Sequence, residues 1–274
     1  MTKRTIQHKP SKVQAFIWLV ALLMIPFVYL FENGLYSFFY KKTQCREPRR
    51  REWRSFAVPI PPGYSVHGLD VSHYSCNIDW DAVKTMNENG VNVDFVFMRA
   101  TKGLDLVDYQ LKDNWEGAKS ANILRGAYHF FRYDLDPARQ AEFFCKHVKI
   151  EVGDLPPVLD IENDKNTNDA KLPKLEVQKN MARWLMIVES KTGVKPLIYC
   201  NLEYYKRYIK EKFPDYKIWV ANYDNNKNVK LPDGRAWHFW QTSENARCSG
   251  ISEKMDFNVF NGDLGALKGL CKQE

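Results

Sequence analysis

The residues best suited to chemistry are two carboxylates, Asp160 and Glu162, at the end of the segment PPVLDIE at 156–162. An apolar run opened by prolines is typical of a buried strand. Side chains alternate between the two faces of a strand, so both carboxylates point the same way, with Cα atoms roughly 6.5–7 Å apart. Like charges this close repel, which favours one acid keeping its proton near neutral pH. Cleavage of a glycosidic bond requires such a pair, although an isolated pair can also simply cap a helix or bind solvent.

The elements that must position this pair alternate along the chain. Candidate strands lie at 66–70, 93–99, 124–130, 157–162, 196–200, 217–221, 237–241 and 254–257. Helical stretches lie between several of them, at 79–89, 107–121, 136–148 and 175–192. Asp136 and Pro137 are suited to the start of one helix and Gly193 to the end of another. This alternation predicts an α/β fold with a parallel sheet, and eight strands predict a single irregular, TIM-like β/α barrel.

Two more carboxylates fall at comparable places in such a barrel. Chemistry in β/α barrels lies at the C-terminal ends of the strands. Asp70 ends the first candidate strand, and Asp256 lies in the last one. The first and last strands of a closed barrel are neighbours, so we expect Asp70 and Asp256 to lie close together. With Asp160 and Glu162 they would form a cluster of four acids on one rim.

Aromatic residues occur at similar positions. They are Tyr128, Tyr199, Trp219, Tyr223 and Trp240. Sugar rings present flat C–H faces that stack on aromatic rings, so a collar of aromatics around the acids suits a glycan substrate. Filling of the core is an equally good explanation for any single one of these rings.

The N-terminal part differs in composition from the rest. Residues 1–65 contain eleven Lys and Arg against three acidic residues, whereas the remainder is nearly neutral and gives no electrostatic case for nucleic acid. The uncharged apolar run Ala15–Phe31 has 17 residues and would span roughly 26 Å as a helix. We predict a basic tail at 1–14, a transmembrane anchor at 15–40, a basic and proline-rich linker at 41–65 and a catalytic domain at 66–274.

The direction in which the anchor crosses the membrane is ambiguous from charge alone. A cleaved signal peptide is the alternative to an anchor, but the run is long and no small-x-small cleavage site follows directly. More Lys and Arg residues follow the run than precede it, which by the positive-inside rule would keep the domain in the cytoplasm. Large domains can translocate despite such charges. Because the charges do not decide the direction, we base it on the predicted function, cleavage of a glycan, and expect an exported domain.

The six cysteines include no C-x-x-C pair, so a zinc site is not expected. An even number of cysteines fits an exported domain with disulfides, and fits buried thiols almost as well. Cys76 follows the first strand and Cys248 precedes the last, which makes a Cys76–Cys248 disulfide a hypothesis.

Ten segments, in order, resemble the glycoside hydrolase family 25 lysozymes, the Chalaropsis-type muramidases. They are GLDVSHY at 68–74, IDWDAVK at 78–84, VDFVFMRATKG at 93–103, GAYHFFR at 126–132, QAEFF at 140–144, PPVLDIE at 156–162, PLIYCN at 196–201, IWVANYD at 218–224, HFWQTSE at 238–244 and MDFNVF at 255–260. The resemblance covers about 66–267. It departs at Lys102, where the family often has a glutamate.

The resemblance implies a flattened barrel that cleaves the β-1,4 bond between N-acetylmuramic acid and N-acetylglucosamine in peptidoglycan. It implies that Glu162 is the proton donor, that Asp160 orients or stabilises the reacting centre, and that Asp70 and Asp256 line the groove. Enzyme nucleophile and substrate-assisted chemistry both remain open. No metal or organic cofactor is expected, and the partners are peptidoglycan strands and, through 15–40, a membrane; we expect a monomer. The alternatives are an inactive wall-binding module and a hydrolase of another N-acetylated glucan such as chitin.

Overall fold

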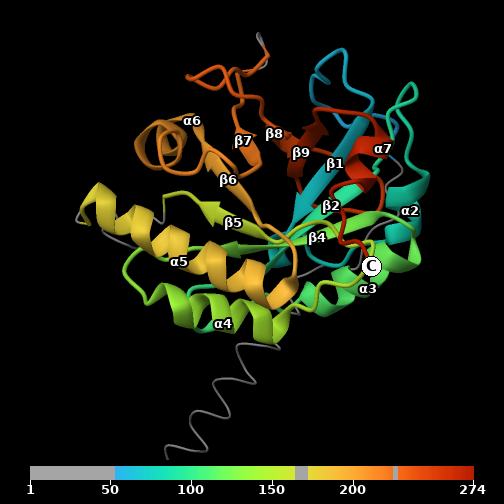
Figure 1. Ribbon diagram of the computed structural model, residues 1–274. Helices are drawn as coiled ribbons and strands as arrows, with labels where there is room; N and C mark the ends of the chain where they lie inside the picture. Colours follow the sequence, from blue (N-terminus) through green and yellow to red (C-terminus); the bar gives the residue numbers. More distant parts are fainter. Residues whose placement is uncertain (1–52, 164–171, 225–227) are drawn as a thin grey trace, which may run out of the picture. The chain divides into compact units, whose positions relative to one another are not determined.

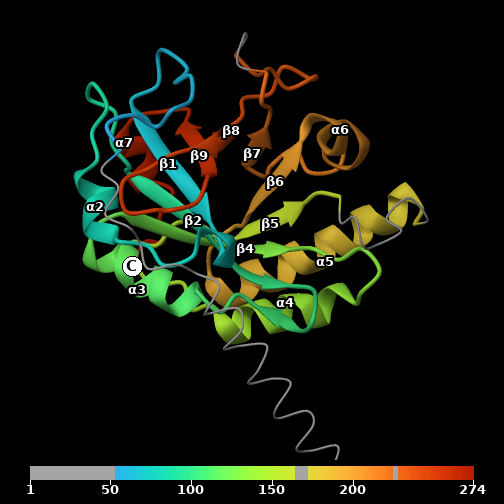
Figure 2. The same ribbon diagram turned by 180° about the vertical axis from the view of Figure 1, so that it is seen from behind.

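The computed structural model of the chain describes residues 53–163, 172–224 and 228–274. Their strands form one sheet in the order β1-β9-β8-β7-β6-β5-β4-β2-β3, and β1 also pairs with β2. This last pairing closes eight of the strands into a barrel (Figures 1 and 2). The short β3 pairs with β2 and lies outside this closed ring. The strands are β1 (Val66–Val71), β2 (Phe95–Lys102), β3 (Leu106–Val107), β4 (Leu124–Phe130), β5 (Val158–Ile161), β6 (Leu197–Asn201), β7 (Ile218–Ala221), β8 (Phe239–Ala246) and β9 (Met255–Phe260).

The predicted barrel is confirmed, but its last strand runs in the other direction. Neighbouring barrel strands from β1 through β2 and β4 to β8 are parallel, whereas β9 is antiparallel to both β8 and β1. The connection from β8 to β9, residues 247–254, is too short for the crossover that a parallel pair needs. As a result, the N-terminal end of β9 lies at the rim where the other strands end.

The longer helices lie along one side of the barrel (Figure 1). They are α3 (Leu111–Ser120), α4 (Pro137–His147) and α5 (Lys174–Thr192). The side chain of Asp136 caps α4 at its start, with Pro137 in the first turn, and Gly193 ends α5 in the left-handed conformation, as the sequence predicts. The shorter helices are η1 (His73–Ser75), α2 (Trp80–Thr85), α6 (Leu202–Tyr204), the π-helical turn η3 (Tyr205–Ile209) and α7 (Leu264–Lys268).

Two predicted helices are shorter in the structure than in the sequence analysis. The stretch predicted at 79–89 forms a helix only over Trp80–Thr85. The one predicted at 107–121 begins at Leu111, because Leu106–Val107 pair with the end of β2 as strand β3. The helix at 264–268 has no counterpart in the prediction.

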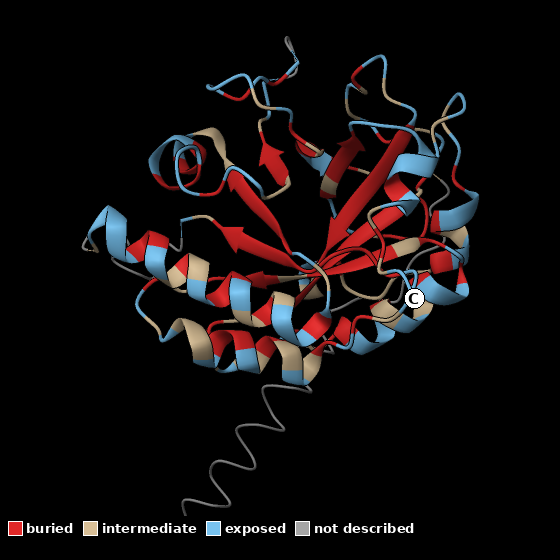
Figure 3. Ribbon diagram, viewed as in Figure 1, coloured by how far each residue is buried: buried red, intermediate tan, exposed pale blue. Residues whose placement is uncertain are grey.

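The strands are buried on both faces (Figure 3). One face points into the barrel, where Phe95, Phe97, Trp219 and Phe239 pack together. The other face packs under the helices, which contribute Phe144, Met181 and Trp184 to a second, larger core, called the outer core below. Alternate residues of one strand therefore belong to different cores, and only the inward-facing set can reach the rim of the barrel.

Gly68 on β1 shows how tightly the interior is filled. A Cβ atom at this position would lie 2.5 Å from the ring of Phe95, and one at Gly126 would lie 2.5 Å from the ring of Phe97. Both glycines therefore make room for large rings that fill the barrel below the rim. Packing of this kind keeps the rim residues on a rigid base.

The hypothesis of a Cys76–Cys248 disulfide is wrong. Cys248 is a buried free thiol, as are Cys200 and Cys271, and Cys145 is also free. Cys76 is disulfide-bonded. Cys248 is instead packed within the core under the helices.

The predicted tail at 1–14 and anchor at 15–40 lie outside the described residues. Within the described residues, no helix combines the length and apolar character that crossing a membrane would need. The described end of the predicted linker packs on the domain: Phe56 is fully buried, and its amide donates to the Glu88 carboxylate at 2.6 Å. The amide of Trp53 likewise donates to Ser249 Oγ at 2.7 Å.

Candidate active site

A pocket opens at the rim where the parallel strands end. It is lined by Asp70, Tyr128, Asp160, Glu162, Tyr199, Trp219, Tyr223, Gln241, Glu244 and Asp256. All four carboxylates singled out in the sequence lie in this lining. The structure therefore brings together residues that are up to 186 positions apart in the printed sequence.

Strand alternation places Asp160 and Glu162 in the pocket. Leu159 and Ile161 pack into the outer core, while Asp160 and Glu162 line the pocket on the inner side of β5. Asp160 is buried, and its Oδ1 atom has no hydrogen-bond partner among the described residues. Glu162 follows the last residue of β5 and is partly exposed. The pair thus combines one buried and one accessible carboxylate.

Asp160 retains its proton to higher pH than an ordinary aspartate does. Its pKa is raised well above the ordinary value, first because burial penalises the carboxylate and then because Glu162 and Asp70 add negative charge nearby. Arg99 and Lys102 act in the opposite direction and do not cancel the effect. Since the charge of Glu162 raises the pKa of Asp160, the pair of acids retains a proton more readily than an isolated carboxylate does.

Asp70 and Asp256 form a second pair on the opposite side of the pocket. Their Cα atoms are register partners across β1 and β9, which confirms the expected proximity. The pKa of Asp256 is raised to about 10 by burial, then by the charge of Asp70 and a hydrogen bond to it. Asp256 therefore stays protonated at neutral pH and donates a hydrogen bond to Asp70.

Two amides that the sequence analysis missed hold Asp70 in place. Gln241 Nε2 donates to Asp70 Oδ2 at 2.9 Å, and Asn258 Nδ2 donates to the same oxygen at 2.7 Å. Both amides and the carboxylate are buried. Asn258 lies two residues after Asp256 on β9, so strand alternation could have placed it on the inner face. Nothing in the sequence alone pairs Gln241 with Asp70.

The predicted aromatic residues have different roles. Tyr199 and Tyr223 donate their hydroxyl protons to Gln241 Oε1 at 2.8 and 2.7 Å, and Trp219 Nε1 donates to Asn258 Oδ1 at 2.8 Å. Trp219 and Tyr199 are buried, so they support the floor of the pocket. Tyr223 is 46% exposed and can offer a ring to a ligand.

The prediction that Trp240 binds substrate is contradicted by its position. Trp240 belongs to the outer core, packs beside Trp237 and Tyr64, and donates from Nε1 to the carbonyl of Asn222 at 2.7 Å. Its neighbour Gln241 points into the pocket instead. A strand that is buried on both faces carries apolar residues on both, so the apolar pattern does not reveal which face a given tryptophan takes.

Two further side chains reach this rim. Glu244 on β8 is exposed, and its charge helps to raise the pKa of Asp256. Lys102 ends β2, with its Nζ 4.3 Å from the centre of the Phe130 ring. Phe130 on β4 is in turn the register partner of Asp160 on β5, so a single strand separates Lys102 from Asp160. The acidic pocket therefore has a positive charge on its β2 side.

Comparison with known proteins agrees with this arrangement. The family described as "Glycosyl hydrolases family 25" matches residues 69–251. The chain belongs to this family. Family 25 membership confirms the resemblance found in the sequence and makes the chain a glycoside hydrolase.

Several known proteins are similar to this chain over most of its length. YegX of Escherichia coli O6:H1 is 37% identical over 264 residues, which cover 94% of each protein. Lysozyme M1 of Streptomyces globisporus is 30% identical over 75% of this chain and 71% of that protein. The structure of a family 25 glycosyl hydrolase from Bacillus anthracis superposes with a TM-score of 0.71 at 32% identity, over 78% of this chain and 97% of that one.

Proposed function

We propose that this family 25 enzyme is a muramidase, which hydrolyses the β-1,4 bond between N-acetylmuramic acid and N-acetylglucosamine in peptidoglycan. The observation that carries the proposal is the carboxylate pair Asp160 and Glu162 on the inner side of β5, in a rim pocket whose lining includes three further acids and four aromatic residues. The similarity to Lysozyme M1 supports the choice of substrate.

In this proposal Glu162 donates a proton to the glycosidic oxygen as the bond to the leaving sugar breaks. It suits the role because it is the more accessible acid of a pair that retains a proton. Asp160 lies deeper, and its unpartnered Oδ1 is available to orient the sugar or, in the state in which Glu162 carries the proton of the pair, to stabilise the developing positive charge. Asp70 and Asp256, held by Gln241 and Asn258, form the opposite wall of the groove.

Replacement of Glu162 by glutamine tests the assignment. The change keeps the shape of the side chain and removes the transferable proton, so we expect turnover to fall by about 10²–10⁴ while glycan binding is kept. The assay uses the full-length chain in a mild detergent and measures the reducing ends released from purified peptidoglycan. Glu116→Gln, an exposed acid on α3 outside the pocket, is the matched control and should keep wild-type activity.

The products separate this function from the two alternatives. Muropeptides with a reducing N-acetylmuramic acid end support the muramidase. Fragments from chitin but not from peptidoglycan would indicate a hydrolase of another N-acetylated glucan. Sedimentation of the protein with peptidoglycan without any release would indicate an inactive binding module. More than about a tenth of wild-type turnover in Glu162→Gln would refute the role of Glu162.

We also propose that residues 15–40 anchor the enzyme and that the domain faces the cell wall as a monomer. The apolar run at 15–31 supports the anchor. A wall hydrolase has its polymerised substrate only outside the cytoplasmic membrane, which supports export despite the basic residues at 41–54. These residues would then lie near anionic groups of the membrane surface and the wall, which attract them.

A further inference from the structure

A second aromatic feature lies just beyond the pocket, in the turn η1 that follows β1. Tyr74 in this turn is 72% exposed. Among the large exposed apolar side chains of the described residues, the other aromatic one is Tyr223, which lines the pocket. Tyr74 is four residues after Asp70, so both come from the same end of β1.

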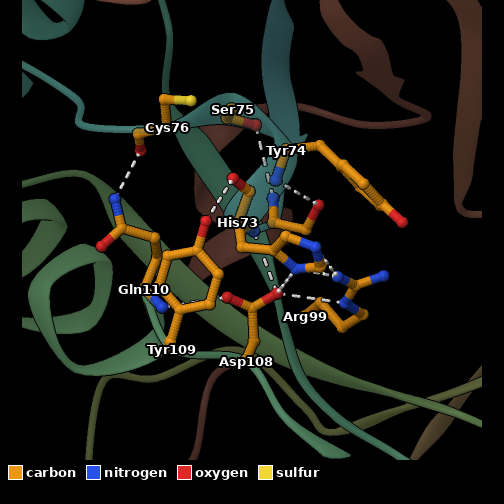
Figure 4. A network of polar contacts seen from close by, with 9 residues as sticks. His73, Tyr74, Ser75, Cys76, Arg99, Asp108, Tyr109 and Gln110 are labelled. Atoms are coloured by element: carbon orange, nitrogen blue, oxygen red, sulfur yellow. Dashed lines mark hydrogen bonds and ion pairs between the residues drawn. The ribbon is translucent and has the colours of Figure 1, made fainter. Parts of the chain in front are cut away.

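The Tyr74 ring is held in place although it is exposed. The ring of His73 lies 4.1 Å from it, centre to centre, and the guanidinium carbon of Arg99 lies 5.2 Å from its centre (Figure 4). The turn itself is fixed by Ser72, whose side chain accepts from the amide of Tyr74 at 3.3 Å. An exposed ring that is already ordered binds a flat ligand without a large entropic cost.

The buried carboxylate of Asp108 fixes His73 and Arg99, the two residues that contact the Tyr74 ring. Asp108 accepts from Arg99 Nε at 3.1 Å and from the amide of His73 at 2.9 Å, and its carboxylate is also 3.0 Å from His73 Nδ1. Arg99 Nη2 contacts the His73 ring as well. Tyr109 adds a second ring, 5.1 Å from that of His73 (Figure 4). The cluster therefore presents Tyr74 on a rigid base.

Arg99 places this cluster next to the pocket. Its register partner on β4 is Tyr128, which lines the pocket, and its guanidinium group also lies over the Tyr74 ring. The exposed ring is thus separated from the pocket wall by one guanidinium group. A ligand that fills the pocket and continues over the ends of β1 and β2 would reach Tyr74.

We propose that Tyr74 is an additional sugar-binding site for a β-linked, N-acetylated glycan strand that extends from the pocket across the ends of β1 and β2. The class of ligand rests on the proposed function. Hexoses offer C–H faces to the open side of the ring, and Arg99 and His73 keep the ring oriented from behind. The site adds affinity for long strands and does not touch the bond that is cleaved.

Binding of short and long oligosaccharides tests this site without relying on turnover. The parent is the full-length Glu162→Gln chain, and the probes are N-acetylglucosamine oligomers of two and six units, measured by calorimetry. Tyr74→Ala should weaken binding of the hexamer about tenfold and leave the dimer unchanged. A factor of ten corresponds to about 1.4 kcal/mol, which is what covering roughly 55 Å² of ring surface contributes.

Two further variants separate stacking from a loss of structure. Tyr74→Phe keeps the ring and should bind the hexamer within about twofold of the parent. Met186→Ala removes a comparably exposed apolar side chain from α5 and should bind like the parent. The melting temperature of each variant is compared with that of the parent, so that unfolding is not mistaken for lost binding.

Three results would overturn the site. They are unchanged hexamer binding by Tyr74→Ala, equal losses for dimer and hexamer, and failure of the parent to bind either the hexamer or purified glycan strands. The proposed chemistry fails in a different way. If the wild-type chain releases no reducing ends but Tyr74→Ala still loses hexamer binding selectively, the sugar site stands and the muramidase does not.

Discussion

Asp256 gives a quantitative test of the electrostatics in the pocket, because its replacement by asparagine should stabilise the fold. The ordinary pKa of an aspartate is 3.8, and in the folded chain that of Asp256 is raised to about 10, first by burial and then by the charge of Asp70. The folded state therefore binds the proton more tightly than the unfolded state. The resulting stabilisation is complete below pH 3.8 and is lost progressively as the pH rises towards 10.

The size of the effect follows from the same shift. Each pH unit between the ordinary pKa and pH 7 lowers the free energy of unfolding by about 1.4 kcal/mol, which sets an upper limit of about 4 kcal/mol over roughly three units. Asp256 is partly exposed and shares its proton with Asp70, so we expect about half of this limit, roughly 2 kcal/mol. An asparagine does not titrate, and its Nδ2 can still donate to Asp70. For a domain of this size, the gain corresponds to a melting temperature about 4–8 °C higher.

Thermal unfolding of the full-length chain at pH 4, 6 and 8 provides the assay. The difference between Asp256→Asn and wild type should be small at pH 4 and grow as the pH rises. Asp215→Asn removes an equivalent charge from an exposed loop before β7 and should stay within about 0.5 kcal/mol of wild type at all three values. A variant that is less stable at pH 8, or a difference that does not change with pH, would refute the reasoning.

Three other changes test separate parts of the structure. Asp160→Asn should lower activity strongly and lower the apparent pKa of the acid limb of the pH–rate profile, because a neighbouring negative charge no longer holds Glu162 protonated; an unmoved acid limb would show that the two acids are not coupled. Gly68→Ala should destabilise the barrel by about 1–3 kcal/mol, since the new methyl group meets the Phe95 ring, and an unchanged melting temperature would mean that the interior has space. A cysteine introduced at the exposed Ser65 should react with a membrane-impermeant thiol reagent in intact cells, with any outer membrane permeabilised, and one at Thr2 should not. The assay uses a Cys145→Ser background, because the other free cysteines of the described part are buried. The reverse labelling pattern would contradict an exported domain.

The sequence by itself determined the barrel and the main acids of the pocket. The spacing of Asp160 and Glu162 fixes their common face, because alternation along a strand is a local property of the backbone. The closeness of Asp70 and Asp256 follows from closure of the barrel, which the count of strands predicts. The order of ten motifs was sufficient to identify family 25.

Tertiary structure decided what depends on contacts between distant segments. The antiparallel direction of β9, the outward position of Trp240 and the free thiol of Cys248 all differ from the sequence-based expectation. Strands buried on both faces carry no polar alternation that would assign a ring to one side. The raised pKa of Asp256 arises from burial beside Asp70, whose charge comes from the other end of the chain. Local spacing cannot encode such a shift, because its cause is the dielectric and the charges that folding brings around the group.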